Sequence, residues 1–141
     1  ILDTISGFTL DPSGYAVAGQ SGVYKIDYSL QLANTDNSSH DIFVWLQTNG
    51  TVVAGSSSRF TVPARKSAGV YGYIVAYSSI EFEIAKGDEI RLWWATEKAY
   101  STTGPVDGVY MPTLPAQVSP YVRPLNPSAV GSINFISRLP A

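Results

Sequence analysis

Two small groups of ionisable residues are the first candidates for chemistry in this chain. Glu81 and Glu83 are two apart, so on a β-strand both carboxylates point the same way, and paired carboxylates can hydrolyse glycosidic bonds. Asp36, His40 and Asp41 cluster around a polar turn and could hold a cation. Plainer interpretations are favoured: a solvated strand face for the two glutamates, and ordinary turn capping for the other three residues.

The composition removes most other chemistry. The 141 residues include no Cys and one His, which excludes thiol nucleophiles, disulfides and multi-histidine metal sites. No glycine-rich phosphate loop or nucleophile elbow occurs. The net charge of −2 predicts no bulk attraction to nucleic acid, and no apolar run approaches the roughly 18 residues of a membrane helix. We therefore predict no catalytic residue, no cofactor, no metal and no membrane insertion.

The elements that must position any site are strands. Alternation of apolar and polar residues marks 22–32, 41–48, 80–84 and 89–95, and 129–137 is expected to be a closing strand. Asn49-Gly50 is a strong hairpin signal. One parity of these strands gives the expected core: Tyr24, Ile26, Tyr28, Leu30, Ile42, Val44, Leu46, Phe82, Ile90, Leu92 and Trp94. In the closing strand either parity could face inward, and Phe135 is favoured for the core.

About eight short strands separated by turns predict an all-β sandwich or barrel. We expect one domain over 1–141, with 1–21 as an N-terminal arm or first strand. The Pro-rich stretch 105–127 should form a loop and edge strand, because proline cannot donate to a central ladder. The chain starts at Ile1 and its one Met is Met111, so we expect a processed or trimmed chain, or a piece whose missing part lies upstream.

Outward-facing aromatic residues are the informative anomaly. With Ile42 and Val44 inside, Phe43 and Trp45 point outward, and Trp93 does so from 89–95 beside Arg91. Only 14 % of the residues are charged, against a norm of about 25 %. Burying three large rings between copies would be worth roughly 5–8 kcal/mol. We therefore predict a trimer interface at Phe43, Trp45, Arg91 and Trp93.

Aromatic residues in the later loops suggest a different use. Tyr100, Tyr110 and Tyr121 lie in turn-like or Pro-rich stretches, where exposed rings could stack on sugars. They are the candidate ligand-contacting residues of a lectin-like module. Use of aromatic rings in a core or an interface is the commoner case.

Three stretches resemble motifs of the jelly rolls of tumour necrosis factor and of complement globular heads. GVYKIDYS at 22–29 is similar to their G-x-Y-x-φ-x-φ-S strand, and VWLQTNGTVV at 44–53 to their N-G hairpin. IAKGDEIRLWW at 84–94 resembles their late G-D strand. The match covers about 22–95 and is loose from 96 on, where the Pro-rich stretch departs from the family's short loops. Hairpins of this kind are common in small virion proteins of tailed phages.

The resemblance implies a two-layer antiparallel jelly-roll sandwich that forms a non-enzymatic homotrimer. In that fold the strands matching 41–48 and 89–95 and the C-terminal element are expected in the sheet that faces the threefold axis. Those matching 22–32 and 73–84 are expected in the outer sheet. The implied function is a structural knob on a virion surface, as capsid decoration or a head- or tail-fibre tip. Its partners would be itself, capsid or fibre proteins, and a host cell-surface glycan. A lectin-like module and a secreted cytokine- or complement-like ligand are the alternatives.

Overall fold

The computed structural model describes residues 2–5, 8–10, 15–104, 106–120 and 122–139. These ranges contain no helix, so none of their segments is a helix long and apolar enough to cross a bilayer. The strands are β1 (Leu2–Ile5), β2 (Phe8–Leu10), β3 (Ala16–Ala18), β4 (Gly22–Asn34), β5 (His40–Thr48), β6 (Thr51–Val52), β7 (Ser58–Val62), β8 (Gly72–Ile84), β9 (Glu89–Thr96), β10 (Val109–Tyr110) and β11 (Ala129–Ser137).

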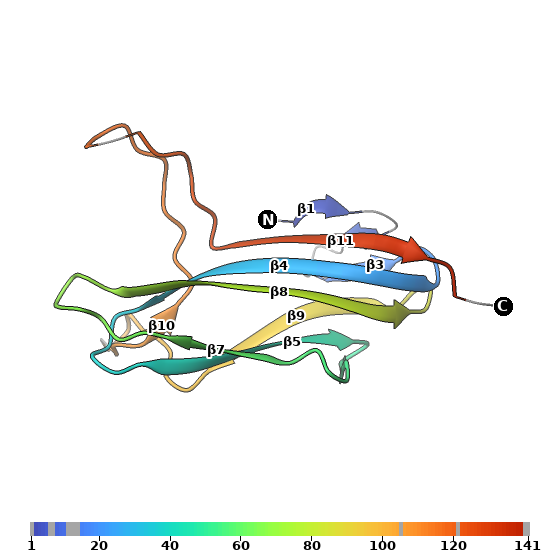
Figure 1. The fold of residues 1–141 in the computed structure, drawn as a ribbon, viewed down its shortest axis with the longest axis horizontal. Helices are drawn as coiled ribbons and strands as arrows, with labels where there is room; N and C mark the ends of the chain where they lie inside the picture. Colours follow the sequence, from blue (N-terminus) through green and yellow to red (C-terminus); the bar gives the residue numbers. More distant parts are fainter. Residues whose placement is uncertain (1, 6–7, 11–14, 105, 121, 140–141) are drawn as a thin grey trace.

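The strands form two sheets packed face to face (Figure 1). Sheet A has the order β1-β11-β4-β8, and β10 pairs with the end of β4. Sheet B has the order β2-β3-β9-β5, with β6 and β7 along the other side of β5. Pairing is antiparallel except between β1 and β11. Because β4, β5, β8, β9 and β11 alternate between the two sheets, the connectivity is that of a jelly roll, which confirms the predicted fold class.

The longest ladder joins β4 to β8 without interruption, from Gly22 opposite Ile84 to Asn34 opposite Gly72. At its far end the chain passes so close to Pro63 that a Cβ on Gly72 would overlap the Pro63 carbonyl oxygen. The predicted Asn49-Gly50 hairpin joins β5 to β6, with φ of 49° and 79° at its two residues. Two positive φ values are the mark of a type I′ turn.

Most of the predicted core is buried, and the register of β5 is confirmed. Ile42 and Val44 are fully buried, while Phe43 between them is 39 % exposed. The other buried members are Tyr24, Ile26, Tyr28, Leu30, Leu46, Phe82 and Ile90, and Trp94 packs half-buried against them. The prediction for Leu92 is wrong. Its side chain has inward parity but is 39 % exposed, because it lines a cavity that opens to solvent.

The C-terminal strand lies in the sheet opposite to the one expected. β11 pairs with β4, from Ala129 opposite Leu30 onward, so it belongs with β4 and β8 and not with β5 and β9. Neighbouring strands are chosen by long-range pairing, which the alternation within one strand does not encode. The favoured parity is correct: Ile133 is buried, and the Phe135 ring packs edge-on against Tyr24 at 5.3 Å between centroids.

Residues 112–120 and 122–128 stand away from the sandwich as an extended arm (Figure 1). Its two sides are bridged at Leu114 with Asn126 and at Gln117 with Arg123. The arm rejoins the body where the carbonyl of Ser128 accepts the backbone N–H of Gln31 at 2.8 Å. It leads directly into β11.

Candidate interaction surfaces

The outer face of sheet B gathers the three rings that were expected to share a surface. Trp45 of β5 pairs directly with Trp93 of β9, and Phe43 pairs with Ala95 on the same ladder. Phe43 is 39 % exposed and Trp93 42 %, whereas Trp45 is half-buried. We call Phe43, Trp45 and Trp93 the tryptophan patch. Contact between copies through this patch stays a prediction.

Arg91, the fourth residue of that predicted interface, lies at the end of the patch. It pairs with Gln47 across the ladder, and its guanidinium lies 4.4 Å from the centroid of the Tyr15 ring. A cation–π contact at an exposed site is worth about 0.5–1 kcal/mol. The stacking therefore directs Arg91 toward the segment before β3.

A second, more exposed apolar surface lies on the outer face of sheet A. Tyr73, Val75 and Tyr77 alternate along β8 and are 57 %, 57 % and 60 % exposed. β10 places Tyr110 beside them, because Tyr110 and Tyr73 both pair with the fully buried Ala33 of β4. The result is a row of large side chains along one half of an open sheet face.

Further tyrosines complete this surface. The Tyr100 and Tyr110 rings lie 5.0 Å apart between centroids, and those of Tyr71 and Tyr73 lie 6.4 Å apart. Burial raises the pKa of Tyr110 above 10.0, and the nearby hydroxyls of Tyr73, Tyr71 and Tyr100 raise it further. We call Tyr71, Tyr73, Val75, Tyr77, Tyr100 and Tyr110 the tyrosine patch. The structure thus brings together Tyr100 and Tyr110, two of the predicted ligand-contacting residues, whereas Tyr121 lies outside the described residues.

The other half of the same sheet face is charged. Lys25 pairs with Glu81 across the β4–β8 ladder, and its Nζ lies 3.6 Å from Asp27 Oδ1. The hydroxyl of Tyr77 donates to the same Asp27 oxygen at 3.2 Å, so it marks the border with the tyrosine patch. Glu81 and Glu83 are exposed on this strand face.

The polar turn after β4 is stabilised by contacts of the Asp36 carboxylate with His40 and Lys98. Asp36 Oδ2 accepts a hydrogen bond from Lys98 Nζ at 2.7 Å and lies 2.6 Å from His40 Nε2. Lys98, and after it His40, holds the pKa of the Asp36 carboxyl far below its usual range. Asp41 is engaged separately and accepts from the Thr61 hydroxyl at 2.6 Å. Among the residues that the structure describes, no three metal-ligating side chains gather closely enough to hold an ion.

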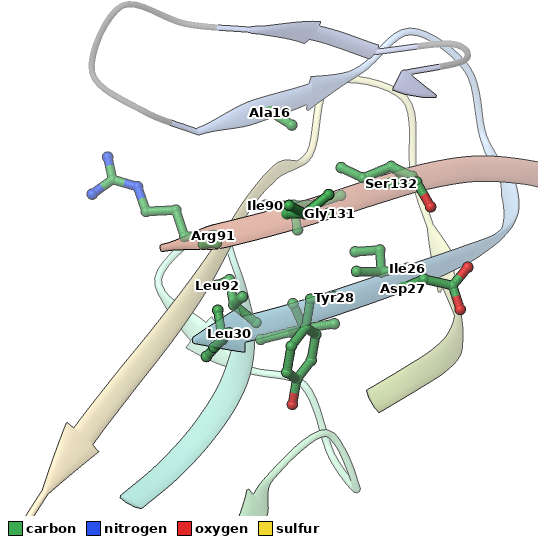
Figure 2. A pocket seen from close by; sticks show the side chains of 14 residues that line it. Ala16, Ile26, Asp27, Tyr28, Leu30, Ile90, Arg91, Leu92, Gly131 and Ser132 are labelled. Atoms are coloured by element: carbon green, nitrogen blue, oxygen red, sulfur yellow. The ribbon is translucent and has the colours of Figure 1, made fainter. Parts of the chain in front are cut away.

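A cavity of about 230 Å³ opens between the sheets on the side of β9 and β11 (Figure 2). Its lining is mostly apolar and comes from both layers, with Ile26 and Leu30 from β4, Leu46 from β5, and Ile90 and Leu92 from β9. Small residues on β3 and β11, namely Ala16, Ala129 and Gly131, leave the space unfilled. Figure 2 shows Arg91 and Asp27 at its rim with their side chains directed away from it.

Parity could have revealed the tyrosine patch from the sequence. Phe82 and Ile84 face inward, and in one continuous strand every second residue before them also faces inward. The residues between those positions, which include Tyr73, Val75 and Tyr77, therefore face outward. In β8 the clear alternation of apolar and charged residues is confined to 80–84, so no contrast marks the outward row in the earlier half of the strand.

Comparison with known proteins assigns no family to the chain. No protein-family model matches it, and no curated protein sequence matches it. Among solved structures, an Eiger TNF from S. frugiperda aligns with a TM-score of 0.45 at 12 % sequence identity, covering 95 % of this chain and 71 % of that one. Similarity at this level assigns neither an activity nor a partner.

Proposed function

We propose that this protein is a non-enzymatic structural module that closes into a homotrimer and forms a rigid knob on a virion surface. It would serve as a capsid decoration or as the tip of a head or tail fibre. The observation that carries the proposal is the tyrosine patch. Three successive outward positions of β8, namely Tyr73, Val75 and Tyr77, are each more than half exposed although they belong to a well-paired strand.

The free energy gained by burying the tyrosine patch between copies would be large relative to the folding stability of a domain this size. Fully burying one large apolar side chain is worth about 1.5–3 kcal/mol, so the patch offers several kcal/mol per subunit. Exposed apolar patches of this kind on soluble proteins mark interaction surfaces. Around a threefold axis three copies of the patch can face each other and exclude water together.

The virion setting is supported by the sequence and by the division of sheet A. The stretch 22–95 resembles jelly rolls that occur in tailed-phage virion proteins. Outside the patch, Lys25, Asp27, Glu81 and Glu83 keep the rest of the sheet face polar, as suits a surface that remains in water. Capsid or fibre proteins of the same particle are the proposed attachment partners, and three copies would add avidity to weak contacts.

Two faces compete for the threefold contact, and paired variants separate them. Light scattering of the purified chain should give three times the 15.2 kDa chain mass. Val75→Glu should yield a monomer, because it forces a charge into a dry contact. Val52→Glu is the matched control, because Val52 is 54 % exposed on the β5–β6 hairpin, and it should remain trimeric.

Trp93→Glu tests the interface expected from the sequence. If the tyrosine patch carries the contact, this variant stays trimeric. If it becomes a monomer while Val75→Glu stays trimeric, the contact lies at Phe43, Trp45, Arg91 and Trp93. A wild-type monomer at micromolar concentration would overturn the proposed assembly.

Glycan binding is a second candidate function, favoured by one observation. The Tyr100 and Tyr110 rings lie 5.0 Å apart with 38° between their planes, at the end of the patch nearest the loops. Such a pair can stack on the apolar face of a sugar. Because Tyr100 belongs to the tyrosine patch, sugar stacking on its ring is tested in the Val75→Glu variant, where Tyr100→Ala should weaken binding to an immobilised neutral polysaccharide. Unchanged retention of Tyr100→Ala would remove this candidate.

A further inference from the structure

We propose that the arm, residues 112–120 and 122–128, docks onto a neighbouring copy of the chain and places its apolar side chains in the cavity between that copy's two sheets. The proposal rests on the homotrimer proposed above, and it adds a contact separate from the tyrosine patch. The arm and the cavity are both on this chain, and both leave apolar side chains exposed in the part of the chain that the structure describes.

Backbone hydrogen bonds join the two sides of the arm. Leu114 and Asn126 exchange two backbone hydrogen bonds at 3.0 and 2.9 Å, and Gln117 and Arg123 exchange two at 2.8 and 2.9 Å. The Arg123 guanidinium also donates to the Pro115 carbonyl at 2.9 Å. Prolines fix φ at five of its positions: Pro112, Pro115, Pro120, Pro124 and Pro127. Because these bonds and prolines already restrict the backbone of the arm, its docking would cost less conformational entropy than docking of a flexible loop.

The apolar side chains of the arm are left in water. Val118 is 84 % exposed, Val122 81 % and Leu125 53 %. The arm stands clear of the sandwich, so the body of the same chain does not cover them (Figure 1). A rigid projection that carries three such side chains is suited to enter a recess.

The cavity supplies a recess of fitting size and character. Its 230 Å³ exceeds the roughly 150 Å³ of an engineered apolar cavity that holds benzene, so branched aliphatic side chains can enter. Leu92, in its lining, is 39 % exposed. Along the adjoining edge of β9, β3 pairs with Glu89 and Ile90.

The geometry of the chain points to another copy as the occupant. The arm joins the body at Ala129, and Ala129 itself lines the cavity. A chain's own cavity therefore lies at the base of its arm, away from the tip that carries Val118 and Val122. A projection and a recess on different parts of one chain make a heterologous contact, which closes into a ring under threefold rotation.

The size of the arm is consistent with an auxiliary role. Standard interfaces use about 20–30 residues on each side, and residues 112–128 supply fewer. The arm would therefore strengthen a trimer whose bodies are already in contact.

Disulfide trapping tests the contact directly, because the chain has no Cys and introduced thiols can pair only with each other. Val118→Cys and Leu92→Cys are made as separate variants, refolded together and mildly oxidised. A bond requires Cα atoms within about 7 Å, so a mixed dimer forms only when one copy's arm reaches the other copy's cavity. The matched control mixes Val118→Cys with Val52→Cys, whose site lies on the β5–β6 hairpin.

Light scattering on the wild type and on the reduced mixtures separates the two proposals. A trimer that gives the Val118–Leu92 bond and not the control bond supports arm docking. A trimer without that bond, or with equal bonding in the control, overturns arm docking and leaves the homotrimer standing. A monomeric wild type overturns the homotrimer and the arm contact with it. In addition, Val118→Ser with Val122→Ser should raise the trimer's dissociation constant about tenfold or more, whereas Val52→Ser should leave it unchanged.

Discussion

Leu46 of β5 and Leu92 of β9 lie directly opposite each other in one antiparallel ladder, yet Leu46 is 1 % exposed and Leu92 is 39 % exposed. Both side chains have the parity that points toward sheet A. They differ in what sheet A offers them, because Leu92 lies where the cavity opens to solvent. The same residue type in one cross-strand pair therefore makes two different contributions to stability.

Replacing each leucine with alanine should separate those contributions. Leu46→Ala should lower the free energy of unfolding by about 2–5 kcal/mol, and Leu92→Ala by about 1 kcal/mol or less, because Leu92 has less buried area to lose. Urea unfolding in the monomeric Val75→Glu background is the measurement, since no neighbouring copy covers Leu92 there. Equal losses at the two sites would contradict the difference in burial.

Acidification should loosen the turn that Asp36 fastens. Lys98 and His40 hold the folded-state pKa of this carboxyl below its unfolded value, which is about 4. The ionised carboxylate therefore contributes its full stabilisation above about pH 4, and this contribution is lost as the pH falls further. The difference in unfolding free energy between wild type and Asp36→Asn should be largest near neutral pH and shrink toward about pH 3.

Lys98→Met provides the control for that pH dependence, because it removes the first cause of the lowered pKa. Its stability should depend less on acid than that of the wild type. Parallel curves for wild type and Asp36→Asn from about pH 7 to pH 3 would contradict the assignment.

Two glycines should respond oppositely to an added methyl group. In Gly72→Ala the new Cβ would overlap the Pro63 carbonyl oxygen, so the backbone must move, at a cost of about 1–3 kcal/mol. In Gly131→Ala the new Cβ would lie 3.4 Å from the Asp27 carbonyl oxygen, an ordinary contact. That variant should be neutral or gain up to about 1 kcal/mol by restricting the unfolded chain. Thermal unfolding of both variants checks the ordering, and equal losses would contradict it.

Much of the fold could be predicted from the sequence because several strands have one apolar and one polar face. The alternation in β4 and β5 gave the correct parity for Tyr24, Ile42 and Phe43. The exposure of Leu92 could not be predicted in this way, because periodicity identifies the inward face and not where the opposite layer stops covering it. The sheet of β11 was assigned wrongly because pairing such as Leu30 with Ala129 joins distant parts of the chain.

The sequence predicted the tryptophan patch and did not predict the tyrosine patch, because only strands with one apolar and one polar face reveal outward aromatic residues. Phe43, Trp45 and Trp93 stood out because each interrupts a strand with a clear parity, and the structure places them on one face. In the first half of β8 both faces are apolar, with Ile74 inward and Val75 outward, so no contrast marks the outward row. The pairing of Tyr100 with Tyr110 depends on β10 and its loop, which no local pattern positions.

The central place of β4 in sheet A also governs how the chain can reach its native state. β4 is synthesised early, but its partners come much later, with Gly22 paired to Ile84 and Leu30 to Ala129. Such non-local pairing places the fold among slow folders, on the millisecond-to-second scale. Until β8 and β11 arrive, β4 has two open edges and an uncovered apolar face, which other nascent chains can join. Crowding of newly made chains, more than the stability of the finished sandwich, should therefore limit the yield of native protein.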